Sequence, residues 1–153
     1  MKTEVERRLE RRDIFLPNCP SPVALYRPAK RIGQFVYSSG QTAWVDKKML
    51  FKGKVGSEVS IEDAQDSARY CALNCISAMR EVADLDKIQI LKVLGFVNAG
   101  PLFEDHPLVV NGASELLITA FGEKGIHSRS AIGVASLPSN ASVEIEIMAC
   151  VCE

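Results

Sequence analysis

Arg129 and Glu144 are the two residues near the end of the chain whose charges could do chemistry together. Arg129 precedes a strand-like run at 130–134, and Glu144 lies in a second run at 143–148, with turn formers at 137–140 between them. Every other residue of the second run is β-branched, so a period of two places Glu144 on the opposite face. These adjacent and otherwise apolar strands could hold the pair rigidly. The pattern predicts either a binding site or a simple salt bridge.

Two helices and a long strand are expected to position this pair. Residues 60–63 have the form of a capping box, and apolar residues at helical spacing follow them. The run at 88–97 is rich in β-formers and predicts a buried strand. Asp105 could cap a second helix, with Pro107 in its first turn and Gly122 as its left-handed stop.

Shorter strands are expected before the first helix. A strand should begin at 23–26 and be limited by Pro28, and 34–38 should pair with it as a β-hairpin. A further short strand is expected at 49–55, interrupted at Gly53.

The N-terminal part carries charges and prolines. Residues 1–12 predict a short solvated helix with Val5 and Leu9 facing inward. The three prolines of 15–22 predict an extended lead-in, because proline disfavours both helix and central strand.

The order of these elements favours one α+β domain over residues 1–153, with 1–19 as an N-terminal extension. Two helices would lie on one face of a single mixed sheet. One helical layer cannot cover both faces. If the other face is apolar beside Glu144 and Met148, we expect another copy of the chain to cover it.

Composition excludes several classes of function. The chain is 47% hydrophobic and 24% charged with a net charge of −1, so it lacks the basic surface expected of a nucleic-acid-binding protein or a ribonuclease. No apolar run approaches the roughly 20 residues of a membrane span, and the charged N-terminus does not resemble a signal peptide. We expect a cytoplasmic protein. None of the five cysteines forms a C-x-x-C pair, so buried free thiols are expected rather than a metal site.

Gly40 and Asn111 have simple alternative explanations. Gly40 has no Cβ and would let a ligand approach the backbone, but a bulge or a strand end explains a glycine there as well. Asn111 could lie on an exposed polar face of the second helix.

Motifs spread over nearly the whole chain resemble the RidA/YjgF family, also labelled endoribonuclease L-PSP. These are Tyr26, Tyr37-Ser-Ser-Gly-Gln41, Val110-Asn-Gly-Ala113, Arg129-Ser-Ala-Ile-Gly-Val-Ala-Ser-Leu-Pro138 and Val143-Glu-Ile-Glu146. The resemblance implies a chorismate-mutase-like α+β fold and a homotrimer with three clefts between subunits. It implies no cofactor and no metal.

The best-known members of this family hydrolyse reactive enamines and imines to 2-oxo acids and ammonia. The resemblance implies that Arg129 holds the substrate carboxylate through its planar fork. It also implies that Glu144 places the attacking water and relays protons, for which a raised pKa would suit it. The other cleft residues that the resemblance implies are Tyr26, Ser39, Gly40, Asn111 and Ala131.

Departures from the family pattern suggest a longer, divergent subgroup. Ala131 stands where a cysteine is common, and Gly133 where a glutamate is common. His127 and Ser128 replace a proline-bearing approach to the arginine, and His127 is a further candidate for the cleft wall. The expected function is therefore an enamine/imine deaminase acting on small metabolites. The alternative is a non-catalytic trimer that binds a small carboxylate or serves as a regulatory subunit.

Overall fold

The computed structural model describes residues 1–22 and 24–152. In chain order the elements are α1 (Glu4–Glu10), β1 (Ala29–Ile32), β2 (Phe35–Ser38), β3 (Trp44–Val45), β4 (Lys48–Met49), α2 (Ile61–Arg80), η1 (Leu85–Lys87), β5 (Ile88–Asn98), α3 (His106–Phe121), η2 (Gly122–Gly125), β6 (Ser128–Val134), η3 (Pro138–Asn140) and β7 (Val143–Val151).

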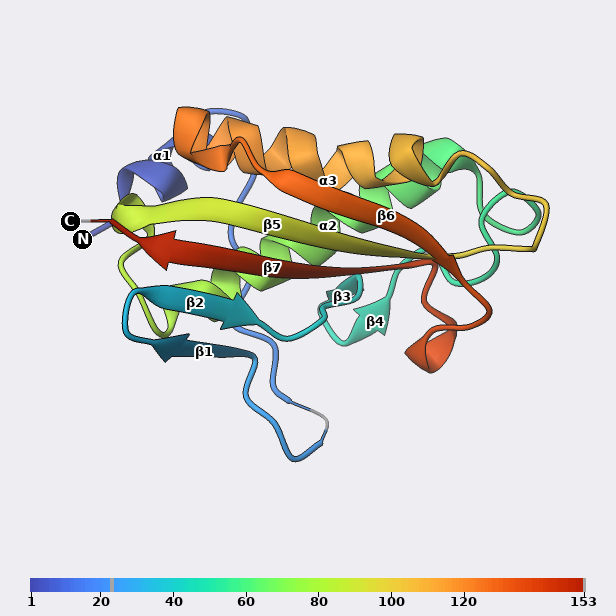
Figure 1. Cartoon of the computed structure of the whole chain (residues 1–153), viewed down its shortest axis with the longest axis horizontal. Coiled ribbons are helices and arrows are strands. Elements are labelled where there is room, and N and C mark those ends of the chain that lie inside the picture. The colour runs from blue at the N-terminus through green and yellow to red at the C-terminus, as the bar shows by residue number, and fades with distance from the viewer. Residues whose placement is uncertain (23, 153) are drawn as a thin grey trace.

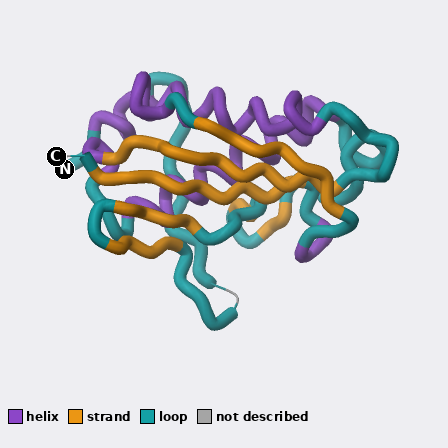
Figure 2. The backbone as a smooth tube through the Cα atoms, viewed as in Figure 1, coloured by secondary structure: helices purple, strands orange, loops and turns teal. Residues whose placement is uncertain are grey.

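A five-stranded mixed sheet has α2 and α3 on one of its faces (Figure 1). The strand order is β1-β2-β7-β5-β6, in which only the β5–β6 pair is parallel. Strands β3 and β4 form a separate small sheet. The strands make one layer and the two long helices a second (Figure 2). The predicted α+β fold with two helices on one sheet face is confirmed.

The backbones of the two long helices, α2 and α3, are in close contact. Helix α2 begins at the predicted cap, where the Ser60 side chain accepts a hydrogen bond from the Asp63 N–H. A Cβ at Gly112 of α3 would lie 2.0 Å from the backbone oxygen of Gln65 in α2, so only glycine fits there. The helix pair therefore covers the sheet as one close-packed layer.

Strand β7 shows how the sheet divides its residues between two faces. Its buried positions alternate, and they lie under the helices: Val143, Ile145, Ile147 and Ala149. Glu144, Glu146 and Met148 consequently lie on the opposite face. We call this the open face, because no described element of the chain covers it. The strand pairings place several exposed large apolar side chains on this face as well: Ile32, Phe35, Tyr37, Ile132 and Met148.

The closing strands are not neighbours, contrary to the expectation from sequence. Strand β5 lies between β6 and β7. Because α3 connects β5 to β6 as a crossover, β6 lies parallel to β5, and β7 pairs antiparallel with the other edge of β5. Residues that are close in the sequence of this region can therefore be far apart in space.

Two short strands were also predicted in the wrong places. The described part of 23–26 is a bend, with Val23 outside the described residues, and β1 begins only after Pro28. Proline cannot donate to a strand ladder, so the ladder starts just beyond it. Only the first residue of 49–55 belongs to a strand, since Phe51 and Gly53 both have positive φ.

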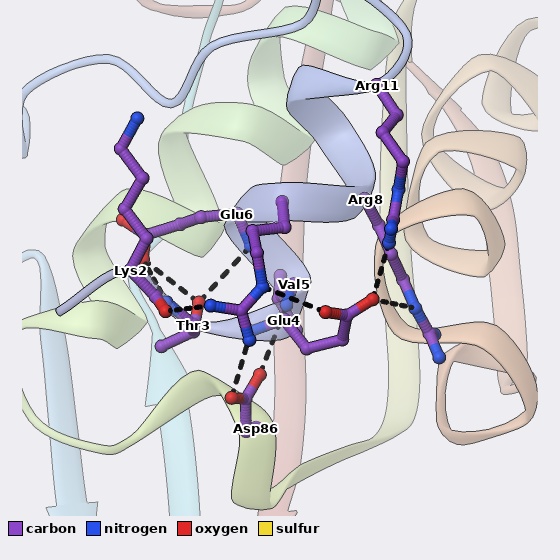
Figure 3. A network of polar contacts seen from close by, with 9 residues as sticks. Lys2, Thr3, Glu4, Val5, Glu6, Arg8, Arg11 and Asp86 are labelled. Atoms are coloured by element: carbon purple, nitrogen blue, oxygen red, sulfur yellow. Dashed lines mark hydrogen bonds and ion pairs between the residues drawn. The ribbon is translucent and has the colours of Figure 1, made fainter.

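Helix α1 is tied to the body of the protein by its N-terminus (Figure 3). The backbone N–H groups of Glu4 and Val5 donate to the carboxylate of Asp86, at 2.9 and 3.1 Å. Val5 and Leu9 are buried, as predicted. Thr3 is the N-cap of this helix, and Asp86 accepts from further N–H groups of its first turn although it lies more than eighty positions later in the chain.

Two buried thiols fasten α2 to β7. The Cys71 Sγ lies 3.4 Å from the Val143 oxygen, and the Cys75 Sγ lies 3.2 Å from the Ile145 oxygen. Burial raises the pKa of the Cys75 thiol to about 12, so it stays protonated and can donate. Within residues 1–22 and 24–152, no helix combines the length and apolarity that a membrane crossing requires.

Candidate functional site

The candidate residues form two groups on opposite faces of the sheet. Arg129 pairs in register with Val93 of β5, whose side chain is buried under the helices. Glu144 pairs with Phe96. Val93 and Phe96 are three positions apart on one strand, so their side chains point to opposite faces. A single copy of the chain therefore does not bring Arg129 and Glu144 into one pocket.

The first group surrounds Arg129, between the edge strand β6 and α3. The Nη1 of Arg129 donates to the Ser114 hydroxyl and its Nη2 donates to the Pro107 backbone oxygen, both at 3.1 Å. No carboxylate of the described chain forms an ion pair with this guanidinium. Half-buried Asn111 precedes Ser114 by one helical turn, and Ala131 follows Arg129 on the same face of β6.

His127 joins this group through Ser114. Its Nε2 lies 2.9 Å from the Ser114 Oγ, and its Nδ1 lies 2.6 Å from the Gly125 oxygen. The sequence had suggested His127 as a cleft residue but had not suggested Ser114. The only signal for Ser114 was its position one helical turn after Asn111, on the same side of α3.

The His106 ring explains why position 133 carries a glycine. A Cβ at this position would lie 2.4 Å from the Nε2 of His106. The His106 ring packs edge-on against Phe103, with ring centroids 5.1 Å apart. The imidazole therefore occupies the space that a glutamate side chain would need at Gly133.

The second group surrounds Glu144, where β2 ends beside β7. A Cβ at Gly40 would lie 2.8 Å from the carboxyl carbon of Glu144, so the missing side chain of Gly40 makes room for this carboxyl group. Ser39 binds the preceding segment, because its hydroxyl donates to the Arg27 oxygen at 2.6 Å. The bend that carries Tyr26 is thereby held near Gly40. Tyr26 itself is exposed.

Glu144 is electrostatically unusual. Burial, with the nearby charge of Glu146 as a second cause, raises the pKa of Glu144 above its usual value of 4.5. Among the described residues it has neither a hydrogen-bond donor nor a cation as partner. Such a carboxyl group gains a proton more readily than an ordinary surface glutamate.

Two hollows of the surface lie beside α1, and neither is lined by Arg129 or Glu144. One lies against Arg8 of α1 and the two arginines that follow the helix, Arg11 and Arg12, and the other lies around Asp86. These two hollows are thus away from the residues that could do chemistry.

Known proteins resemble this chain over most of its length. The family model of YjgF/chorismate mutase-like endoribonucleases matches residues 6–151. Protein TCP17 of Trypanosoma cruzi is 36% identical over 143 residues, or 92% of this chain and 89% of that protein. A 2-iminobutanoate/2-iminopropanoate deaminase of Dermatophagoides farinae is 30% identical over 137 residues, or 89% of this chain and 93% of that protein.

A solved structure has the same fold over most of the chain. Protein Atu1372 of Agrobacterium tumefaciens has a TM-score of 0.88 and 39% identity to this chain, covering 96% of this chain and 91% of that one. The resemblance read from the motifs is therefore confirmed by the family match and by the fold. This chain belongs to the YjgF/chorismate mutase-like endoribonuclease family.

Proposed function

We propose that this protein hydrolyses reactive 2-imino or 2-enamino acids to 2-oxo acids and ammonia. The observation that carries the proposal is the guanidinium of Arg129, which is held by two neutral oxygens and has no acidic partner in the described chain. A guanidinium in that state keeps its full charge for a ligand carboxylate. The relative with a 2-iminobutanoate/2-iminopropanoate deaminase name supports the reaction class.

The active site would lie between two copies of the chain in a homotrimer. Arg129 is on the edge strand and Glu144 on the open face, so the two can meet only if the edge of one copy covers the open face of the next. The exposed apolar side chains of that face give the copies a reason to associate. Closed cyclic symmetry would then repeat the site at each interface.

Each group then has a role in the reaction. Arg129 of one copy binds the substrate carboxylate, and the Gly40 N–H, which has no acceptor among the described residues, contacts the substrate from the other copy. Glu144 takes a proton from water as the oxygen attacks the C=N carbon, and returns it to nitrogen. This gives a carbinolamine, whose new hydroxyl then passes its proton through Glu144 to the amine. The C=O bond forms as the C–N bond breaks, so ammonia leaves and the 2-oxo acid remains. The raised pKa of Glu144 suits both transfers.

Complementation between two inactive variants tests the shared site. Arg129→Ala and Glu144→Ala should each abolish ammonia release from imines that an amino-acid oxidase generates in the assay. When the two variants are unfolded together and reassembled, roughly a quarter of the interfaces should contain one intact arginine and one intact glutamate, so activity should return in that proportion. Mixed assemblies without activity would place the site within one copy. An inactive wild type would overturn the proposed reaction.

A non-catalytic carboxylate-binding protein is the alternative function. Ala131 and Gly133 favour it, because they provide no polar side chain where the deaminases commonly carry a cysteine and a glutamate. Wild-type protein that binds a 2-oxo acid but releases no ammonia would support this alternative. A ribonuclease activity has no support in the net charge of −1.

A further inference from the structure

We infer that Ser114 and His127 are positioning residues that orient Arg129 for carboxylate binding, an inference that rests on the proposed function. The three side chains form a continuous chain of hydrogen bonds from β6 across α3 to the segment after η2. Arg129 meets Ser114 at 3.1 Å, Ser114 meets His127 at 2.9 Å, and His127 meets the Gly125 oxygen at 2.6 Å.

The direction of each hydrogen bond follows from the group at the end of the chain. The Gly125 carbonyl can only accept, so the Nδ1 of His127 carries a proton. In the neutral imidazole the Nε2 is then an acceptor, and the Ser114 hydroxyl donates its one proton to it. The lone pairs of the Ser114 oxygen remain free to accept from the Nη1 of Arg129. Each donor and acceptor therefore has one partner and one direction.

The guanidinium is fixed at two points by this arrangement. Ser114 accepts from Nη1, and the backbone oxygen of Pro107 accepts from Nη2. Two such contacts prevent the planar group from rotating about its long, flexible stem, yet they leave further N–H groups free for a ligand. Neither partner carries a negative charge. Arg129 is thus held in position without losing its attraction for a carboxylate.

The backbone places His127 where this chain requires it. A Cβ at Gly125 would lie 2.3 Å from the Leu117 backbone oxygen of α3, so the turn rests directly on the helix. That close approach brings both the Gly125 oxygen and His127 to the side of α3 that carries Ser114. The positioning chain therefore depends on a glycine that a search for charged residues would not single out.

The direct test is the binding of pyruvate to the assembled protein, measured by calorimetry. Ser114→Ala should weaken binding about tenfold, as expected for one lost hydrogen bond to a charged group. Ser114→Thr should restore most of the affinity, because it keeps the hydroxyl. His127→Ala should weaken binding less, since it acts through Ser114, and His127→Gln should retain part of the effect. Ser128→Ala is the matched control, because Ser128 lies on the other face of β6 and bonds the Leu91 oxygen.

A double-mutant cycle separates positioning from a general structural effect. In an Arg129→Ala background, Ser114→Ala should cause no further loss of affinity, whereas a merely structural role would still lower it. If the wild type binds pyruvate and the Ser114→Ala variant binds it equally well, this inference is overturned while the proposed function stands. Wild type that does not bind pyruvate or another 2-oxo acid would overturn the proposed function and, with it, this inference. His127→Ala provides the same comparison should Ser114→Ala fail to fold.

Discussion

Glu144 is the residue whose surroundings most clearly differ from those of an ordinary surface carboxylate. Its carboxyl group lies over the bare backbone of Gly40 and on the same face as Glu146. Arg129, in contrast, is held by uncharged groups on the other face. Each side chain would serve one part of the proposed imine hydrolysis, and neither neutralises the charge of the other within one copy.

The pH dependence of stability should reveal the raised pKa of Glu144. Because its pKa is raised in the folded chain, the carboxyl group binds more protons in the folded state than in the unfolded state. Its contribution to the free energy of unfolding therefore falls as pH rises through the interval between the unfolded and the folded pKa. Glu144→Gln removes the ionisation. The variant should therefore unfold at higher urea concentration than the wild type near neutral pH, and the difference should narrow as pH falls toward 4.5.

The same stability comparison in an Arg129→Ala background tests whether a neighbouring copy acts on Glu144. In the proposed assembly, Arg129 of a neighbouring copy would oppose the pKa shift, so the difference should be larger in an Arg129→Ala background. Glu104→Gln is the control, because Glu104 is exposed and has no hydrogen bond or ion pair with the described residues. A Glu144→Gln variant that is less stable than wild type at every pH would show that the carboxylate is stabilised rather than strained.

At the level of elements, close backbone contacts determine how the helices position the site. Gly112 brings α3 onto α2, and Gly125 brings the following turn onto α3. These contacts set where Ser114 and Pro107 meet Arg129. The helix pair therefore helps to position Arg129, although most of its buried residues pack in the hydrophobic core.

Gly112→Ala should destabilise the protein although alanine is the better helix former. The gain in helix propensity is about 1 kcal/mol. The new Cβ would lie 2.0 Å from the Gln65 backbone oxygen, and such overpacking costs roughly 1–3 kcal/mol or more because backbone cannot move aside easily. We expect a net loss of about 1 kcal/mol or more in the free energy of unfolding, measured by urea denaturation.

Gly100→Ala is the matched control for that substitution. A Cβ built at Gly100 meets no residue beyond its chain neighbours within 4 Å, so the free energy of unfolding of the Gly100→Ala variant should stay close to that of the wild type. Equal stability of both variants would mean that α2 and α3 can separate without cost.

At the level of the whole molecule, one face of the sheet is left with exposed apolar side chains. Met148 lies near its centre, in register with Tyr37 of β2 and Lys92 of β5. Glu144 lies on the same face. Covering this face would both remove apolar surface from water and enclose the carboxyl group.

Met148→Glu should dissociate the proposed trimer. A new charge buried without a partner at the interface weakens association on the order of a hundredfold or more. We expect folded monomers by size-exclusion chromatography with light scattering, a retained circular dichroism spectrum, and loss of ammonia release. Leu102→Glu is the control, since Leu102 is 92% exposed in the loop after β5. A trimer that survives Met148→Glu would place the interface elsewhere.

Local pattern was sufficient for much of the fold. The helical spacing after Ser60, the cap itself and the alternation along β7 depend on residues a few positions apart, and all of these were predicted correctly. The alternation also placed Glu144 on the correct face. The family followed from short motifs in order along the chain.

Strand neighbours and contacts between distant residues required the folded chain. Whether β6 pairs with β7 depends on the crossover through α3 and on the central place of β5, and periodicity carries no information about either. For the same reason, the sequence could not show that Arg129 and Glu144 lie on opposite faces. Nor could it show that Ser114 links Arg129 to His127, because that contact arises only once a helix and a strand pack together.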